Sequence, residues 1–294
     1  MRRSKTESGS GRCFTGVWKR ALLREEVRRV EMYGGFADVY DELMDNVPYE
    51  QWSRILDTLI GTYGVSRPER GAKGALESER DQVLDLGCGT GTMAELMYAL
   101  GYDVLGVDLS EDMLNVAMEK REKSGSGILY LRQDMRKLEL YSTVGTVYSV
   151  CDSLNYILKE EELLQVFSLV NNYLFPGGIF IFDFNTDYKY REIIGDATIA
   201  ESREDCSFIW ENYYDAETGL NEYDLTVFVR KEKDLFRRFC EVHRQRGYTL
   251  EQMTELLERA GMVFLEARDA DTLGPVEPKS GRIRVVAGER GKTR

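Results

Sequence analysis

The residues most able to do chemistry lie in a glycine-rich turn. Residues 83–86 form a short apolar run, which is typical of a buried strand, and Gly87-Cys88-Gly89-Thr90-Gly91 follows at once. Residues 93–100 predict a helix, which Gly101 ends. Glycines let the backbone bend sharply and let a ligand approach it, and the start of a helix offers free N–H groups. The turn is therefore a candidate binding site, although a purely structural strand–turn–helix has the same local pattern.

An acidic residue follows at the end of the next predicted strand. Residues 104–107 form that strand, and Asp108 lies at its tip. A carboxylate in this position can accept hydrogen bonds from both hydroxyls of a ribose. The unit therefore predicts an adenosine-type ligand across the carboxyl ends of the strands.

Two details distinguish between adenosine-type ligands. The dinucleotide pattern is GxGxxG, whereas the glycines here are spaced GxGxG, and Thr92 stands in the place of the third dinucleotide glycine. Asp85 would repel a pyrophosphate but suits a cationic ammonium or sulfonium group. Both details favour S-adenosylmethionine over NAD.

The rest of the chain supplies the elements that must position these residues. Further buried strands are predicted at 129–131, 144–151 and 179–184, with a helix over 163–174 that ends before Pro176-Gly177-Gly178. Strands that alternate with helices indicate an α/β fold with a doubly wound parallel sheet. Two amphipathic helices are predicted before it, from Tyr33 to Met44 and from Trp52 to Leu59.

The second half interrupts this rhythm. Three antiparallel strands are predicted over 198–214, 220–231 and 235–246, followed by a helix over 249–260 and two last strands at 263–267 and 282–287. The predicted division is an extension over 1–31, the N-terminal helices and cofactor-binding α/β core over 32–196, an antiparallel β insertion over 197–246, and the end of the core over 247–294.

Residues 1–31 differ from the rest in charge. They hold nine basic and four acidic residues, a net charge of +5, which leaves −17 for residues 32–294 of a chain whose total is −12. A nucleic-acid arm or a transit peptide would have such a composition, but a disordered or artefactual extension, with translation starting at Met32, is favoured.

Composition excludes several function classes. The 294 residues are 43 % apolar, enough to bury a core, and the single His excludes a site that needs two imidazoles. The acidic balance argues against nucleic acid as the main partner. Five cysteines without a CxxC pair argue against a disulfide framework or zinc site, and no apolar run approaches a membrane span. The chain is therefore expected to be cytoplasmic, without metal or membrane contact.

Four segments, in order, resemble the class I S-adenosylmethionine-dependent methyltransferases. They are VLDLGCGTGTMAELM at 83–97, VLGVDLSEDML at 104–114, RQDMRKL at 132–138 and LFPGGIFIFDFN at 174–185. YGGFADVYDELMDNVPYEQW at 33–52 resembles a bacterial small-molecule branch that contains the YqeM-like proteins and sugar-amine N-methyltransferases. The resemblance implies a seven-stranded Rossmann-like sheet, with the β insertion forming a roof over the active site.

The resemblance also implies a role for each matching residue. Gly87, Cys88, Gly89 and Gly91 would form the loop under the methionine part of the cofactor, and Asp85 would help to hold its amino group. Asp108 would bind the ribose. The adenine would meet the remaining residues: Leu109, Met113, Asp134 and Met135.

Further residues would complete the cofactor pocket. The Cys151 carbonyl would lie near the methionine amine. Tyr33, Tyr40 and Trp52 would form a lid, although aromatic residues at helical spacing also pack as ordinary core.

Direct SN2 transfer to a nitrogen or oxygen needs a general base only if the acceptor arrives protonated. The candidates are Tyr156, His243, Asp152 and Glu211, of which Tyr156 and His243 are favoured, although a lone His in a strand is more often a structural residue. The sugar-amine enzymes have a His near the position of Tyr156, so this difference argues against a sugar-amine substrate. A basic group on the last insertion strand could bind an anionic substrate, but a solvated strand face is favoured; the group comprises Arg237, Arg238, Arg244 and Arg246.

The sequence thus predicts a methyltransferase for a small-molecule acceptor, acting as a monomer or homodimer. An RNA or protein methyltransferase and a noncatalytic S-adenosylmethionine-binding domain remain alternatives.

Overall fold

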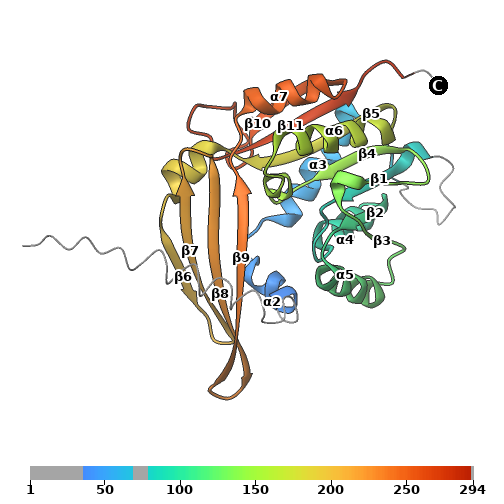
Figure 1. The fold of residues 1–294 in the computed structure, drawn as a ribbon. Helices are drawn as coiled ribbons and strands as arrows, with labels where there is room; N and C mark the ends of the chain where they lie inside the picture. The colour runs from blue at the N-terminus through green and yellow to red at the C-terminus, as the bar shows by residue number, and fades with distance from the viewer. Residues whose placement is uncertain (1–35, 69–78, 293–294) are drawn as a thin grey trace, which may run out of the picture. The chain divides into compact units, whose positions relative to one another are not determined.

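A computed structural model describes residues 36–68 and 79–292 (Figure 1). The extension over 1–31 and the predicted lid residue Tyr33 lie outside the described residues.

A seven-stranded sheet forms the centre of the fold, in the order β10-β11-β5-β4-β1-β2-β3. The strands from β5 to β3 are parallel, and β11 is antiparallel to both of its neighbours. The predicted α/β class and the Rossmann-like sheet are confirmed. The strands are β1 (Gln82–Leu86), β2 (Asp103–Asp108), β3 (Leu129–Arg132), β4 (Val144–Ser149), β5 (Leu174–Asn185), β10 (Met262–Asp269) and β11 (Arg282–Glu289).

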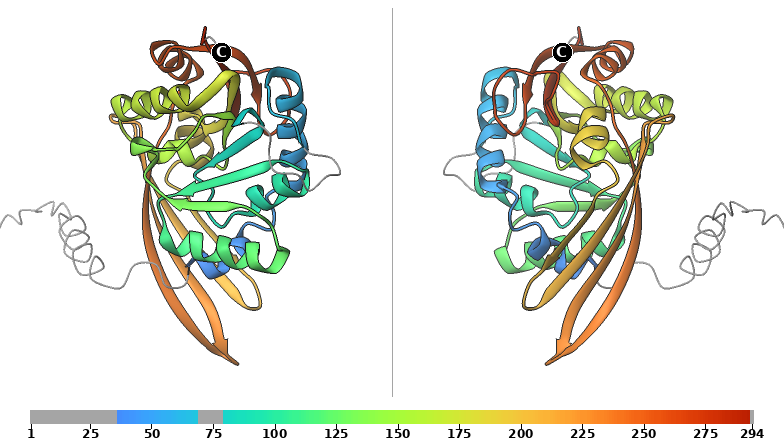
Figure 2. Two further views of the ribbon diagram at one scale, coloured as in Figure 1. Left: turned by 90° about the vertical axis from the view of Figure 1, so that its right-hand side faces the viewer. Right: turned by 90° about the vertical axis from the view of Figure 1, so that its left-hand side faces the viewer.

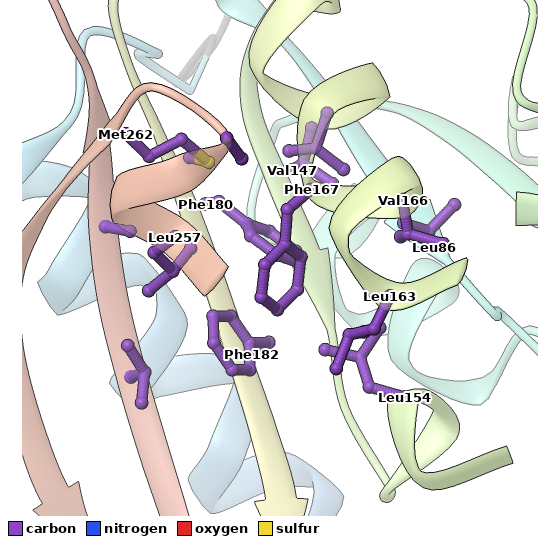
Figure 3. Packing of buried hydrophobic residues seen from close by; sticks show 14 of the residues in the cluster. Leu86, Val147, Leu154, Leu163, Val166, Phe167, Phe180, Phe182, Leu257 and Met262 are labelled. Atoms are coloured by element: carbon purple, nitrogen blue, oxygen red, sulfur yellow. The ribbon is translucent and has the colours of Figure 1, made fainter. Parts of the chain in front are cut away.

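Helices cover both faces of this sheet. α6 (Glu160–Tyr173) and α7 (Leu250–Arg259) bury apolar side chains in one core cluster, whereas α3 (Tyr49–Tyr63) and α4 (Thr92–Ala99) bury theirs in another. In the first cluster the Phe167 ring packs 5.4 Å from the Phe182 ring (Figure 3). The remaining α-helices are α2 (Phe36–Leu43) and α5 (Glu111–Ser124).

A separate four-stranded antiparallel sheet has the order β6-β7-β8-β9. Its strands are β6 (Thr198–Ser202), β7 (Cys206–Asp215), β8 (Leu220–Glu232) and β9 (Leu235–Arg246). Its long strands run along one side of the seven-stranded sheet (Figure 2). Val39 of α2 packs against Leu225 and Val227 of β8, so α2 lies between this sheet and α5 (Figure 1).

Several element boundaries differ from the sequence prediction, two of them in strands that form the sheets. The expected single strand over 198–214 is a hairpin, because the chain turns after Ser202 and the Arg203 N–H donates to the Cys206 carbonyl at 2.8 Å. The fifth strand begins at Leu174 rather than 179, because Leu174 already pairs with Val144 and the glycine pair forms an irregularity inside the strand.

Asn155 connects the two sheets. Its fully buried side-chain amide donates to the Asn185 carbonyl at 2.9 Å and to the Arg246 carbonyl at 2.7 Å. Its carbonyl oxygen accepts from the Asn185 N–H at 2.9 Å. One side chain therefore fixes the end of β9 to the end of β5.

We expect Asn155→Ala to lower the free energy of unfolding by about 2–4 kcal/mol, because it removes three hydrogen bonds to the backbone, two of them fully buried. Urea denaturation measures this loss, and Ser168→Ala on the exposed side of α6 is the control, within about 0.5 kcal/mol of wild type. A loss below about 1 kcal/mol for Asn155→Ala would contradict this account of the sheet connection.

Candidate active site

The glycine turn lies where β1 meets α4. Gly87, Gly89 and Gly91 all have positive φ, at 82°, 53° and 75°. A Cβ on Gly87 would approach the Ser153 side chain to 2.8 Å, whereas a Cβ on Gly89 would meet no atom within 4 Å. Ser153 therefore packs against the loop at Gly87, whereas the space beside Gly89 is open. A ligand has room there to approach the backbone of the loop.

Asp108 holds this loop from the end of β2. One carboxylate oxygen accepts from the Gly89 N–H and the other from the Ser110 N–H, both at 2.8 Å. Burial raises the pKa of Asp108, and the backbone donors oppose that rise. Each oxygen keeps a free lone pair. Asp108 can therefore accept two further hydrogen bonds, as a ribose would require.

The apolar residues after Asp108 leave an uncovered surface. Leu109 is 60 % exposed, so a ligand beside Asp108 could cover its side chain. Met113 is half-buried in the first turn of α5, where its N–H donates to the Ser110 hydroxyl at 3.3 Å.

Asp85 is the most buried carboxyl group of the site, with 1 % of its surface exposed. Burial raises its pKa to about 8, the neighbouring Tyr148 hydroxyl opposes the rise, and the charge of Asp108 adds to it. Its Oδ2 has no hydrogen-bond partner among the described residues. Cys88 is buried beside it, and burial likewise raises the pKa of the thiol. An unpaired carboxyl oxygen at the floor of the site is a position for a cationic donor.

Asp134 is already engaged. It accepts from the Arg136 N–H at 2.9 Å and from the Arg136 guanidinium at 2.7 Å, contacts that lower its pKa. An adenine amino group at Asp134 would have to share the carboxylate with Arg136. Met135 reaches the glycine loop, since its Cε lies 3.5 Å from the position of a Cβ on Gly87.

The chain turns sharply after β4. The predicted strand over 144–151 ends at Ser149, because Cys151 and Asp152 both adopt left-handed φ, at 60° and 50°. Asp183 accepts from both N–H groups, at 3.2 and 2.8 Å. Arg282 lies 2.9 Å from the Asp152 carboxylate and 3.2 Å from that of Asp183. The two carboxylates and the buried guanidinium hold a strained turn beside the glycine loop.

The two described lid candidates have different surroundings. Burial raises the pKa of Tyr40, and its ring packs edge-to-face on Phe36, with ring centroids 5.6 Å apart. The Trp52 ring lies 5.0 Å from the Arg282 guanidinium carbon and therefore supports this buried cation.

Sequence reasoning did not find the contact that fastens α2 to the glycine loop. Asp41 accepts from the Thr90 hydroxyl at 2.6 Å and from the Thr92 hydroxyl at 3.1 Å, and it pairs with Lys120 of α5 at 2.5 Å. These residue types are ordinary for a helix surface, so no local pattern marks them.

The two favoured catalytic candidates lie together. The Tyr156 hydroxyl is 3.1 Å from His243 Nδ1 and 3.0 Å from the Tyr223 hydroxyl. His243 Nε2 is 3.0 Å from a Glu241 carboxylate oxygen. Sequence reasoning found neither Tyr223 nor Glu241, although the i, i+2 spacing of Glu241 and His243 places both on one face of a strand.

The other candidates have different positions. Asp152 is bound by Arg282 and by the Gln245 amide, and Glu211 is exposed on β7. Arg244 pairs with Glu222 and Arg246 with Glu160, whereas Arg237 and Arg238 are exposed.

In the described part of the chain, no helix is both long and apolar enough to cross a membrane. The same residues hold no group of three or more His, Cys, Asp or Glu that could bind a metal ion.

Comparison with known proteins gives concordant matches. Residues 83–178 match a family described as a methyltransferase domain. The chain is 37 % identical over 234 residues to a protein of Geobacillus sp. (strain WCH70) that is named as a methyltransferase, covering 80 % of this chain and 90 % of the relative. It is 36 % identical over 231 residues to YqeM of Bacillus subtilis, also named as a methyltransferase, covering 78 % and 86 %.

A solved structure gives the same match in three dimensions. The crystal structure of an S-adenosylmethionine-dependent methyltransferase from Clostridium acetobutylicum superimposes with a TM-score of 0.76 at 29 % identity, covering 87 % of this chain and 98 % of that one.

Proposed function

This chain belongs to the S-adenosylmethionine-dependent methyltransferases, and we propose that it methylates a nitrogen or oxygen atom of a small molecule that binds beside the glycine turn. The single observation that carries the proposal is the position of the Tyr156–His243 pair. It stands at the end of a short 3-10 helix, η3 (Ser153–Tyr156), whose other end touches the glycine loop, where the Ser153 hydroxyl is 3.4 Å from the Gly87 carbonyl oxygen.

The residues around the glycine turn fit the cofactor. Gly89 leaves open space for it, each carboxylate oxygen of Asp108 has a lone pair for a ribose hydroxyl, and the buried carboxyl of Asp85 would attract the positively charged amino group. The adenine ring would bury apolar surface of the exposed Leu109 side chain. S-adenosylmethionine supplies an electrophilic methyl group on a sulfonium, so this chain needs only to orient the acceptor and remove its proton.

Several observations support a small acceptor over RNA. The net charge is −12, and Arg244 and Arg246 are already paired with carboxylates. The Tyr156 hydroxyl contacts Tyr223 and His243, and the Phe36 ring packs against His243 with ring centroids 6.2 Å apart. Flat aromatic walls with a few polar groups are typical of small-molecule sites.

The test is an acceptor screen in which the full chain and S-adenosylmethionine are incubated with pools of amines and hydroxyl compounds. Release of S-adenosylhomocysteine, with loss of the signal in Tyr156→Phe, is the expected result. Turnover with RNA or protein fractions and with none of the small molecules would overturn the proposed acceptor class.

The raised pKa of Asp85 predicts that cofactor binding releases a proton. With a pKa of about 8 the carboxyl is mostly neutral at pH 7, and a bound ammonium group favours its ionised form. Binding at pH 7 should therefore release close to one proton, and the affinity should rise about tenfold per pH unit up to about pH 8.

Calorimetry of S-adenosylmethionine binding in buffers of different ionisation enthalpy counts this proton. Asp85→Asn, which keeps the shape of the side chain, should release none. Equal proton release from wild type and Asp85→Asn would show that Asp85 is not the group that ionises.

A further inference from the structure

We propose that Tyr156, His243 and Glu241 form a one-directional proton relay, which restricts the acceptor to amines and hydroxyl compounds that must lose a proton. This inference rests on the proposed function and deepens it. Tyr156 would touch the acceptor, His243 would take up the proton, and Glu241 is a positioning residue that acts through His243.

The hydrogen bonds fix the direction of the relay. A carboxylate only accepts, so His243 Nε2 must donate to Glu241 across their 3.0 Å contact. Nδ1 of the neutral imidazole is then an acceptor, so the Tyr156 hydroxyl donates to it across 3.1 Å. The Tyr156 oxygen is left to accept from the Tyr223 hydroxyl at 3.0 Å. The hydrogen bonds are thus donated in one direction, from Tyr223 to Tyr156, from Tyr156 to His243 and from His243 to Glu241.

Tyr156 transfers a proton to His243 without remaining as a tyrosinate anion. Burial raises the pKa of its hydroxyl, and the charge of Asp152 adds to the rise, so a stable tyrosinate is excluded at neutral pH. Its side chain nevertheless remains accessible, because the residue is 44 % exposed. Such a hydroxyl is suited to take a proton from the acceptor while it gives its own proton to His243.

The surroundings of His243 offer partners for the imidazolium that the transfer forms. The Tyr223 ring is stacked on the imidazole, with ring centroids 4.8 Å apart and an interplanar angle of 13°. The groups facing the imidazole are Glu241 on β9, Tyr223 on β8, Tyr156 in η3 and Phe36 of α2. The Glu241 carboxylate and the stacked face of the Tyr223 ring are both favourable partners for a cation.

The proton transfer balances as follows. The N–H or O–H bond of the acceptor breaks, its proton goes to the Tyr156 oxygen, and the Tyr156 proton goes to His243 Nδ1. The electron pair left on the nitrogen or oxygen forms the bond to the methyl carbon, while the carbon–sulfur pair stays with sulfur. One positive charge disappears from the sulfonium and one appears on the imidazole, which later returns its proton to water.

The single His of the chain makes the relay directly observable. In the tag-free full chain, labelled with ¹⁵N, the long-range ¹H–¹⁵N spectrum of His243 reports which ring nitrogen carries the proton. We expect the Nε2–H tautomer in wild type and in Tyr223→Phe, and a mixture of both tautomers in Glu241→Gln, because an amide can donate as well as accept. A dominant Nδ1–H tautomer in wild type, or an unchanged tautomer in Glu241→Gln, would overturn the relay.

Kinetics of an amine from the acceptor screen supply the second readout. His243→Gln should lower kcat by about 10²–10⁴-fold near neutral pH, and the loss should shrink at higher pH, where the amine arrives without its proton. A loss that is independent of pH would show a merely structural role. Titration with S-adenosylmethionine separates the two proposals. Failure of the wild type to bind the cofactor rejects the proposed function. A dominant Nδ1–H tautomer of His243 in a chain that does bind the cofactor rejects only the relay.

Discussion

Replacing Asp108 by alanine should weaken the binding of S-adenosylmethionine by about 100-fold or more. The variant removes two hydrogen bonds between a carboxylate and the ribose hydroxyls, each worth about 1.5–3 kcal/mol when one partner is charged. It also removes the acceptor for the Gly89 and Ser110 N–H groups, both held at 2.8 Å, so the loop loses its fixed shape. Titration calorimetry measures the loss.

Two further variants separate these contributions. Asp108→Asn keeps one acceptor oxygen and the size of the side chain, so its affinity should lie between those of wild type and Asp108→Ala. Glu111→Ala removes a carboxylate three residues along the chain, which is 66 % exposed and paired with Arg132, and should leave the affinity unchanged. Binding to Asp108→Ala within about threefold of wild type would remove Asp108 from the cofactor site.

Replacing Arg282 by leucine should cost about 3–5 kcal/mol of folding free energy. The guanidinium is 11 % exposed and lies within 3.2 Å of two carboxylates, those of Asp152 and Asp183, which are 25 % and 6 % exposed. Without Arg282 the half-buried Asp152 carboxylate and the buried Asp183 carboxylate would lose the positive charge that compensates them. The strained Cys151–Asp152 turn, whose N–H groups Asp183 accepts, should lose its shape with them.

Arg244→Leu is the matched control for this prediction. Its guanidinium lies 2.6 Å from Glu222 but is 53 % exposed, so its loss should cost less than about 1 kcal/mol. Chemical denaturation of both variants measures the difference. Equal losses would mean that burial does not decide the contribution of the Arg282 pairs.

The elements that local pattern defines could be predicted from the sequence. The apolar run at 83–86 and the glycines after it determine a strand and a turn by themselves, and both have the expected place in the structure. The hairpin of β6 and β7 could not be predicted, because nothing in the composition of residues 203–205 distinguishes a turn from an exposed stretch of strand.

The site was predictable only where its residues are marked by type. Tyr156 and His243 can be identified as candidates from the chemistry of their side chains. They are 87 residues apart, however, and only the fold brings them into contact. Asp41, Glu241 and Arg282 are ordinary charged residues in sequence. Their roles depend on burial and on distant partners, which no local pattern encodes.

Titration of the full chain with S-adenosylmethionine, S-adenosylhomocysteine and NAD tests the central claim most directly. The two S-adenosyl compounds should bind and NAD should not, and a ligand at 100 times its Kd should stabilise the fold by about 2.7 kcal/mol. Absence of binding by both S-adenosyl compounds, or binding of NAD in their place, would contradict the assignment of the glycine turn to this cofactor.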